Sequence, residues 1–185
     1  MTRISAILLV SGLFLLTGCQ SITAPDSNNP PWYATPQVGS YIELHQELTA
    51  PRGKRIYIQY GEARPKREIN ELEPYCQFYV DRRGAEMREP LVIAKDRFII
   101  ENVFRKRDIT GLVRARYASS DDGMDFDGSP SQQTMSTYME IFSDRQPQVT
   151  RLICSRWADP YIHNHVRLNE IHESLGDLAA LVPAG

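Results

Sequence analysis

Two closely spaced histidines come nearer than any other residues of this sequence to a metal-ligand pattern. His163 and His165 are separated by Asn164, and His172 follows a few residues later. On an extended backbone, His163 and His165 would share one face, and imidazole is a good ligand for zinc and copper. However, the pair lies at the start of an expected helix, and no H-E-x-x-H motif or set of four Cys and His ligands supports it. We therefore expect no metal and no cofactor, with His163 and His165 as the candidate ligands of the alternative.

The acidic segment Asp121 to Gly128 has the composition of a calcium loop but not its register. In that register the first ligand would be Gly123, which has no side chain. The twelfth would be Thr134, where a bidentate Glu is needed. We expect a solvated acidic loop, and weak calcium binding stays open as an alternative.

Motifs of nucleophilic and phosphoryl-transfer catalysis are absent from the sequence. It contains no G-x-S-x-G elbow and no Gly-rich phosphate loop. Ser155, Asp159 and His163 could be drawn as a triad, but nothing in their local sequence distinguishes them from polar groups at the end of a strand. We expect a protein without enzymatic activity.

Three short basic groups stand in an otherwise balanced chain, at residues 64–67, 82–83 and 105–107. They could meet lipid headgroups or an acidic partner, but acidic residues stand beside them, which favours an ordinary solvated surface. The formal net charge of −2 also lacks the basic excess of nucleic-acid-binding domains. We expect no nucleic-acid partner.

The first 18 residues have the layout of a secretory signal. Arg3 precedes the apolar run of residues 4–16, which is too short to span a bilayer comfortably. The run ends in Leu16-Thr17-Gly18-Cys19, which resembles the lipobox of bacterial lipoproteins. The resemblance implies cleavage before Cys19, lipidation of Cys19 and firm attachment to a membrane. The next residue is Gln20. In bacterial lipoproteins, Asp at this position favours retention in the inner membrane, so the resemblance with Gln20 implies the periplasmic face of the outer membrane.

The two remaining cysteines, Cys76 and Cys154, form a pair in a chain expected to be exported. Disulfides persist in oxidising compartments, and the even count outside the lipobox favours a bond between them. The alternative is two buried free thiols. No C-x-x-C spacing is present, so a redox pair is not favoured.

The mature chain divides into a tether and one domain. Residues 19–31 are rich in Ser, Asn and Pro and have little to bury, so we expect a flexible tether there. Residues 32–185 have the length of a single domain.

Alternating apolar residues predict that this domain is built mainly from strands. Residues 42–48 and 56–60 are expected to form a hairpin, and Cys76, Phe78 and Val80 share one face of a later strand. Further strands are expected around residues 98–104, 112–117, 135–142 and 152–154. An exposed loop is expected over residues 118–133.

The period changes near the C-terminal end, where apolar residues predict an amphipathic helix over residues 164–181, weakened by Gly176. The expected fold is α+β or mainly β. It has about six or seven antiparallel strands in a sandwich or partly open barrel, and one C-terminal helix.

These observations predict a lipid-anchored envelope protein that binds or scaffolds another envelope protein without catalysis. The first alternative is a carrier of small apolar ligands with a cavity inside a barrel. The second is a metal-dependent hydrolase that uses His163 and His165.

Overall fold

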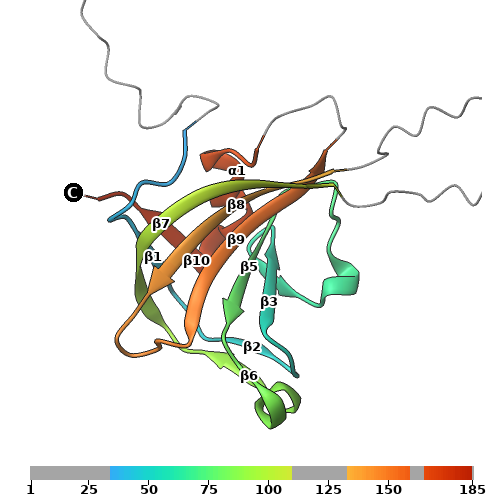
Figure 1. Cartoon of the computed structure of the whole chain (residues 1–185), viewed down its shortest axis with the longest axis vertical. Coiled ribbons are helices and arrows are strands. Elements are labelled where there is room, and N and C mark those ends of the chain that lie inside the picture. Colours follow the sequence, from blue (N-terminus) through green and yellow to red (C-terminus); the bar gives the residue numbers. More distant parts are fainter. Residues whose placement is uncertain (1–33, 110–132, 159–164, 185) are drawn as a thin grey trace, which may run out of the picture.

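An eight-stranded antiparallel sheet curls into a half-barrel in the part of the chain that the computed structural model describes, residues 34–109, 133–158 and 165–184 (Figure 1). The strand order is β10-β1-β7-β8-β9-β5-β3-β4, so β10 and β4 are the two edges. Two shorter strands, β2 and β6, form a separate small sheet. The strand bounds are β1 (Tyr41–Leu44), β2 (Leu48–Ala50), β3 (Arg55–Gln59), β4 (Glu62–Arg64), β5 (Tyr75–Val80), β6 (Leu91–Ile93), β7 (Asp96–Ile109), β8 (Gln133–Phe142), β9 (Val149–Ala158) and β10 (Ala179–Val182).

The mainly β class with a C-terminal helix is confirmed, but the expected count of six or seven strands is wrong. The two chain segments expected to form the first hairpin also do not pair. Instead, β1 lies between β7 and β10, whereas β3 lies between β4 and β5. The strand expected over residues 112–117 lies outside the described residues, as does the loop over residues 118–133 except for Gln133, which begins β8.

The C-terminal helix is shorter than its apolar pattern predicts. The helix α1 (Leu168–Leu175) gives way to a single 3₁₀ turn, η3 (Gly176–Leu178), and the chain then continues as β10. Gly176 has φ +51° and ψ −137°, a conformation that residues with a side chain rarely adopt. The expected extent, residues 164–181, is therefore wrong, because Gly176 redirects the chain to pair with β1.

The two other 3₁₀ turns are η1 (Lys66–Glu68) and η2 (Gly84–Arg88). None of the helices that the structure describes is long and apolar enough to cross a membrane.

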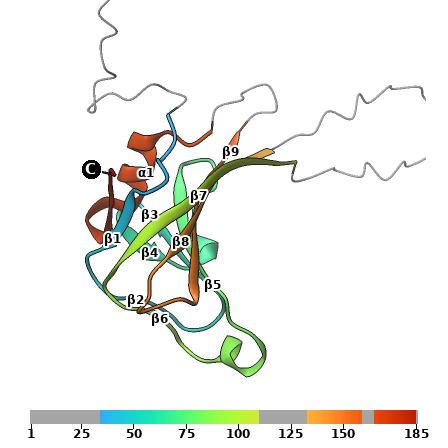
Figure 2. The same cartoon turned by 60° about the vertical axis from the view of Figure 1, so that its left-hand side comes forward.

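The hydrophobic core lies on the concave face of the half-barrel. Strand residues alternate between the two faces, and the concave positions are almost completely buried. Large side chains fill this space, with Phe78 and Phe98 in tilted contact at 6.1 Å between ring centroids. The helix α1 contacts β3, β5 and β10, so it closes the open side between the two sheet edges, and it buries Ile171 and Leu175 there (Figure 2).

Two glycines allow α1 to pack against the β3–β4 turn. The N–H of Gly61 donates a hydrogen bond of 3.0 Å to the carbonyl of Ser174 near the end of α1. A Cβ atom on Gly176 would lie only 2.5 Å from the Cα of Gly61, so the two backbones touch directly. This contact joins the helix to the β3–β4 edge of the sheet.

A buried carboxylate fixes the turn between β8 and β9. Asp96, at the start of β7, accepts hydrogen bonds from Ser143 Oγ at 2.6 Å, from Gln146 Nε2 at 3.0 Å and from the guanidinium of Arg145. Burial by itself raises the pKa of Asp96, but these bonds and the backbone N–H of Arg97 outweigh it and lower the pKa to about 2. The ionised form of Asp96 is therefore part of the folded structure.

Because Asp96 is ionised in the folded structure, we expect the free energy of unfolding to fall in acid. Because its folded pKa of about 2 lies below the ordinary value of 3.8, its contribution is complete above about pH 4 and is lost as the pH falls towards 2. The loss should be about 2 kcal/mol in the free energy of unfolding. We expect Asp96→Asn to cost about 2–3 kcal/mol at pH 7 and to flatten this part of the pH profile. Urea unfolding between pH 2 and 7 measures both effects.

The neighbouring Asp144 provides the control for this measurement, because it is an exposed carboxylate in the same turn. Asp144→Asn should keep the acid-dependent loss of the native chain. A pH profile of Asp96→Asn that runs parallel to the native profile would contradict the role assigned to Asp96.

Candidate functional site

The predicted disulfide is confirmed. Cys76 of β5 and Cys154 of β9 lie directly opposite each other in adjacent strands, with Cα atoms 4.0 Å apart, and both are fully buried on the concave face. They are covered by core side chains, so the bond joins two strands inside the core. Because the bond is buried in the core, we interpret Cys76 and Cys154 as residues that stabilise the fold.

The other predicted candidates are not brought together in the described structure. Cys19, His163 and the acidic loop lie outside the described residues. Within those residues, no group of three or more His, Cys, Asp or Glu side chains could hold a metal ion. Ser155, the first member of the triad considered above, shares a buried hydrogen bond of 2.8 Å with the hydroxyl of Ser136.

His165 lies in a partly buried position just before α1. Burial lowers its pKa, the positive charge of Arg105 lowers it further, and a backbone hydrogen bond involving Ser136 acts in the opposite direction. Its Nδ1 is buried without a hydrogen-bond partner in the described part of the chain, and Thr137 Oγ1 is in the same state. Burial and the neighbouring charge therefore favour the neutral form of His165.

The basic groups noted in the sequence largely pair with neighbouring acids. Arg64 contacts Glu62 at 2.6 Å, and Lys106 contacts Asp108 at 2.8 Å. Lys66, Arg67 and Arg83 also form ion pairs with nearby carboxylates. Five of these basic side chains therefore form ion pairs, whereas Arg105 is partly buried and donates a hydrogen bond to the carbonyl of Ala34.

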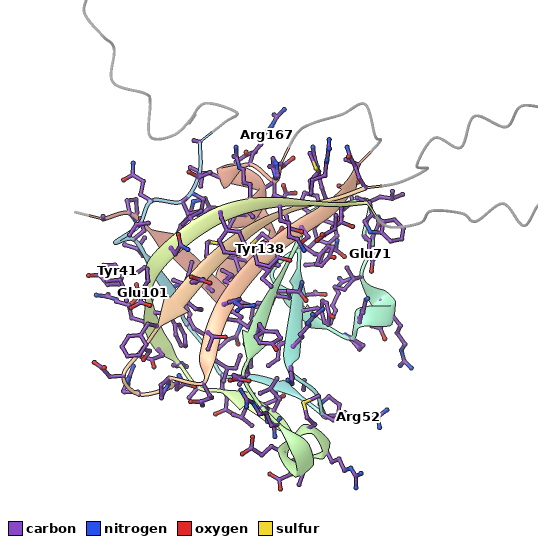
Figure 3. All side chains as sticks on the ribbon, viewed as in Figure 1. Tyr41, Arg52, Glu71, Glu101, Tyr138 and Arg167 are labelled. Atoms are coloured by element: carbon purple, nitrogen blue, oxygen red, sulfur yellow. A yellow bond between two sulfur atoms is a disulfide. The ribbon has the colours of Figure 1, made fainter. Side chains whose placement is uncertain are left out.

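The convex face of β1, β7 and β8 carries a set of aromatic and apolar side chains that are exposed or half-buried in the described structure. In one cross-strand row, Tyr41 of β1 pairs with Ile99 of β7, which pairs with Phe142 of β8. In another, Phe104 of β7 pairs with Tyr138 of β8. We call these five residues the aromatic strip. Figure 3 labels Tyr41 beside β1 and Tyr138 further into the sheet.

Phe104 and Tyr138 form a flat platform on this face. Their rings stack with centroids 4.9 Å apart and an interplanar angle of 9°. Phe104 and Phe142 are each 38% exposed, although large apolar side chains are usually placed inside. Between the two rows, Asn102 Nδ2 donates a hydrogen bond of 3.1 Å to Glu140 Oε2.

A β-bulge sets which side chains reach the convex face. The register between β7 and β8 shifts between Ile100 and Asn102, so Glu101 has no direct partner. Because of this shift, Phe104 faces outward and Val103 packs against the core. Apolar alternation correctly places Phe104 in the same strand as Phe98 and Ile100, but one inserted residue leaves no clear sequence signal, so the bulge was not predicted.

Comparison with known proteins gives no relative: no family model, no curated protein and no solved structure matches this chain.

Proposed function

We propose that this chain is a lipid-anchored protein of the bacterial outer membrane, which faces the periplasm and binds an envelope protein without catalysis. The aromatic strip is the observation that carries the binding part of this proposal. Tyr and Phe are enriched at the centres of protein interfaces, because they bury a large apolar area at a small entropic cost. The stacked platform of Phe104 and Tyr138 is already ordered, so little side-chain freedom is lost on binding.

The anchoring part of the proposal is supported by the sequence. Leu16-Thr17-Gly18-Cys19 ends a short apolar run, and Gln20 follows it. The disulfide between Cys76 and Cys154 is consistent with an oxidising compartment such as the periplasm. The tether of residues 19–31 would let the domain reach a partner away from the bilayer.

Two alternatives stay as predictions that no particular observation favours. A carrier of apolar ligands would need space on the concave face, where Phe78, Phe98 and the helix α1 are packed. A metal-dependent hydrolase would need further ligands near His165.

Site-specific crosslinking in intact cells tests the proposed function. A photoreactive benzophenone amino acid in place of Phe104 should capture a defined protein, and the product should be found in the outer-membrane fraction. Adding Tyr138→Ala should reduce the yield about tenfold or more, since a central aromatic contact contributes about 2 kcal/mol or more. Mass spectrometry of the crosslinked product identifies the partner.

Val92 provides the matched control, because it is an apolar residue that is 46% exposed but belongs to the small β2–β6 sheet. The same photoreactive residue at position 92 should not capture this partner. Equal yields from positions 92 and 104, or no product above background at position 104, would argue against the aromatic strip as the binding surface.

A further inference from the structure

Three cationic side chains surround the ring of Tyr79 on the convex face of β5. Lys54 Nζ lies 6.0 Å from the ring centroid, Arg55 Cζ lies 5.8 Å from it, and Arg151 Cζ lies 5.6 Å from it. The sheet register creates this arrangement, because Tyr79 pairs with Arg55 of β3 on one side and with Arg151 of β9 on the other. Cations and tyrosine faces attract each other only modestly at exposed sites.

A surface hollow of about 440 Å³ lies beside this ring. Arg52, Lys54 and Arg55 line it together with the side chains of Tyr57, Tyr79 and Met87. Arg52 and Lys54 come from the turn between β2 and β3, and Met87 comes from η2. Arg52 lies beside η2, at the end of the molecule away from α1 (Figure 3). We call these six residues, with Arg151 beside Tyr79, the cationic hollow.

The four cations of the hollow have no acidic partner among the described residues. None of them takes part in an ion pair, although eight ion pairs are formed elsewhere in the described structure. Glu140 is opposite Arg151 in the register but accepts its hydrogen bond from Asn102. Like charges brought together in this way repel one another, and a bound anion would remove that repulsion.

Two carboxylates of the adjacent segment, those of Asp81 and Glu86, are engaged elsewhere. Glu86 of η2 accepts a hydrogen bond of 3.3 Å from the backbone N–H of Arg83, and Asp81 contacts the side chain of Arg83 at 3.7 Å. Arg82 donates to the backbone carbonyls of Gly53 and Glu89, so it holds the turn that carries Lys54 against the η2 segment. The position of the cations is therefore built into the fold.

We propose that the cationic hollow binds a phosphoryl group that carries a small organic substituent. Guanidinium groups match phosphate oxygens in a bidentate geometry, and the Lys54 ammonium adds a compact charge. The volume of the hollow exceeds what a single phosphate fills, and Tyr57, Tyr79 and Met87 offer apolar surface to an attached group. The site uses other residues than the aromatic strip, so it does not depend on the proposed function.

Titration of the full chain in a neutral detergent with two soluble probes tests this proposal. One probe is inorganic phosphate, and the other is glycerophosphoglycerol, the acyl-free headgroup of phosphatidylglycerol. Calorimetry and ³¹P line broadening measure binding at constant ionic strength. We expect the double variant Arg55→Gln/Arg151→Gln to bind at least about tenfold more weakly, because each charge-assisted hydrogen bond supports roughly that factor.

The charge-matched control is Lys66→Gln/Arg67→Gln, which removes two exposed cations from η1, outside the hollow. It should bind both probes as the native chain does. If the Arg55 and Arg151 variant does not fold, Arg52→Gln/Lys54→Gln carries the same test, since these residues lie in a turn.

The two probes separate the possible sources of the phosphoryl group. Tighter binding of glycerophosphoglycerol supports the proposal, with a lipid headgroup as the source of the phosphoryl group. Tighter binding of inorganic phosphate would overturn the part of the proposal that assigns an organic substituent to the ligand. Binding of neither probe, or an equal loss in the control variant, would overturn the proposal. Neither result would affect the crosslinking at position 104, so the two proposals fail separately.

Discussion

Gly176→Ala should lower the free energy of unfolding by about 3 kcal/mol. The new Cβ would lie 2.5 Å from Gly61 Cα and 3.1 Å from Gly61 N, so either α1 or the β3–β4 turn must move. Overpacking of this kind costs about 1–3 kcal/mol, and a disfavoured backbone conformation adds about 1–3 kcal/mol. Urea unfolding at pH 7, followed by circular dichroism, measures the change.

Gly84→Ala separates the two contributions to this loss. Gly84 has a similar φ of +56°, but a Cβ there would meet nothing within 4 Å. We expect it to cost only about 1 kcal/mol, the strain of a left-handed residue. If both variants lose the same stability, the contact between Gly61 and Gly176 does not hold α1 in place.

Removing the disulfide should have the largest effect on stability. The bond closes a loop between residues that are 78 positions apart, and we expect the double variant Cys76→Ala/Cys154→Ala to lose about 4 kcal/mol. Most of this loss arises because the unfolded chain gains conformational freedom. The shift of the urea midpoint, with its slope, gives the value.

Reduction of the native chain provides an independent measurement. Both sulfur atoms are buried, so a reductant should act only near the unfolding midpoint, where the core opens. Added reductant should bring the native chain close to the double variant and should leave the double variant unchanged. A native midpoint that does not respond to reductant would show that the bond contributes little.

Sequence patterns predicted the strands that have one buried face. Met135, Thr137, Met139 and Ile141 share the concave face of β8 as expected, because alternation directly reflects burial on one side. The expected shared face of the β5 strand around Cys76 is confirmed in the same way. In β9, the residues from Leu152 to Ser155 are buried on both faces, which hides the period.

Strand pairing could not be predicted in the same way. The first predicted hairpin was wrong because a local pattern does not say which distant strand will be the neighbour. The end of the predicted helix was wrong because Leu178, Ala179 and Val182 fit a helical period, while Ala179 and Leu181 stand two residues apart on the buried face of β10. Only the packing of Gly176 against Gly61 decides between them.

The cationic hollow was missed for a related reason. The basic residues noted in the sequence are those at 64–67, 82–83 and 105–107, and most of these pair locally with acids. The hollow instead combines Lys54 and Arg55 with Arg151, which only the register of β3, β5 and β9 brings together. Part of the signal was local, because Arg52, Lys54 and Arg55 stand within four residues of the sequence. Only the addition of Arg151 required the register of β5 and β9.

The order of strands in the sheet also constrains the order in which the domain can fold. β1, at residues 41–44, forms one of its two ladders with β10, at residues 179–182. During synthesis, β1 must therefore wait with one unpaired edge until nearly the whole domain has emerged. Such delayed, long-range closure folds slowly and leaves strand edges open to other chains, which makes a chaperone that covers nascent strands especially useful to this protein.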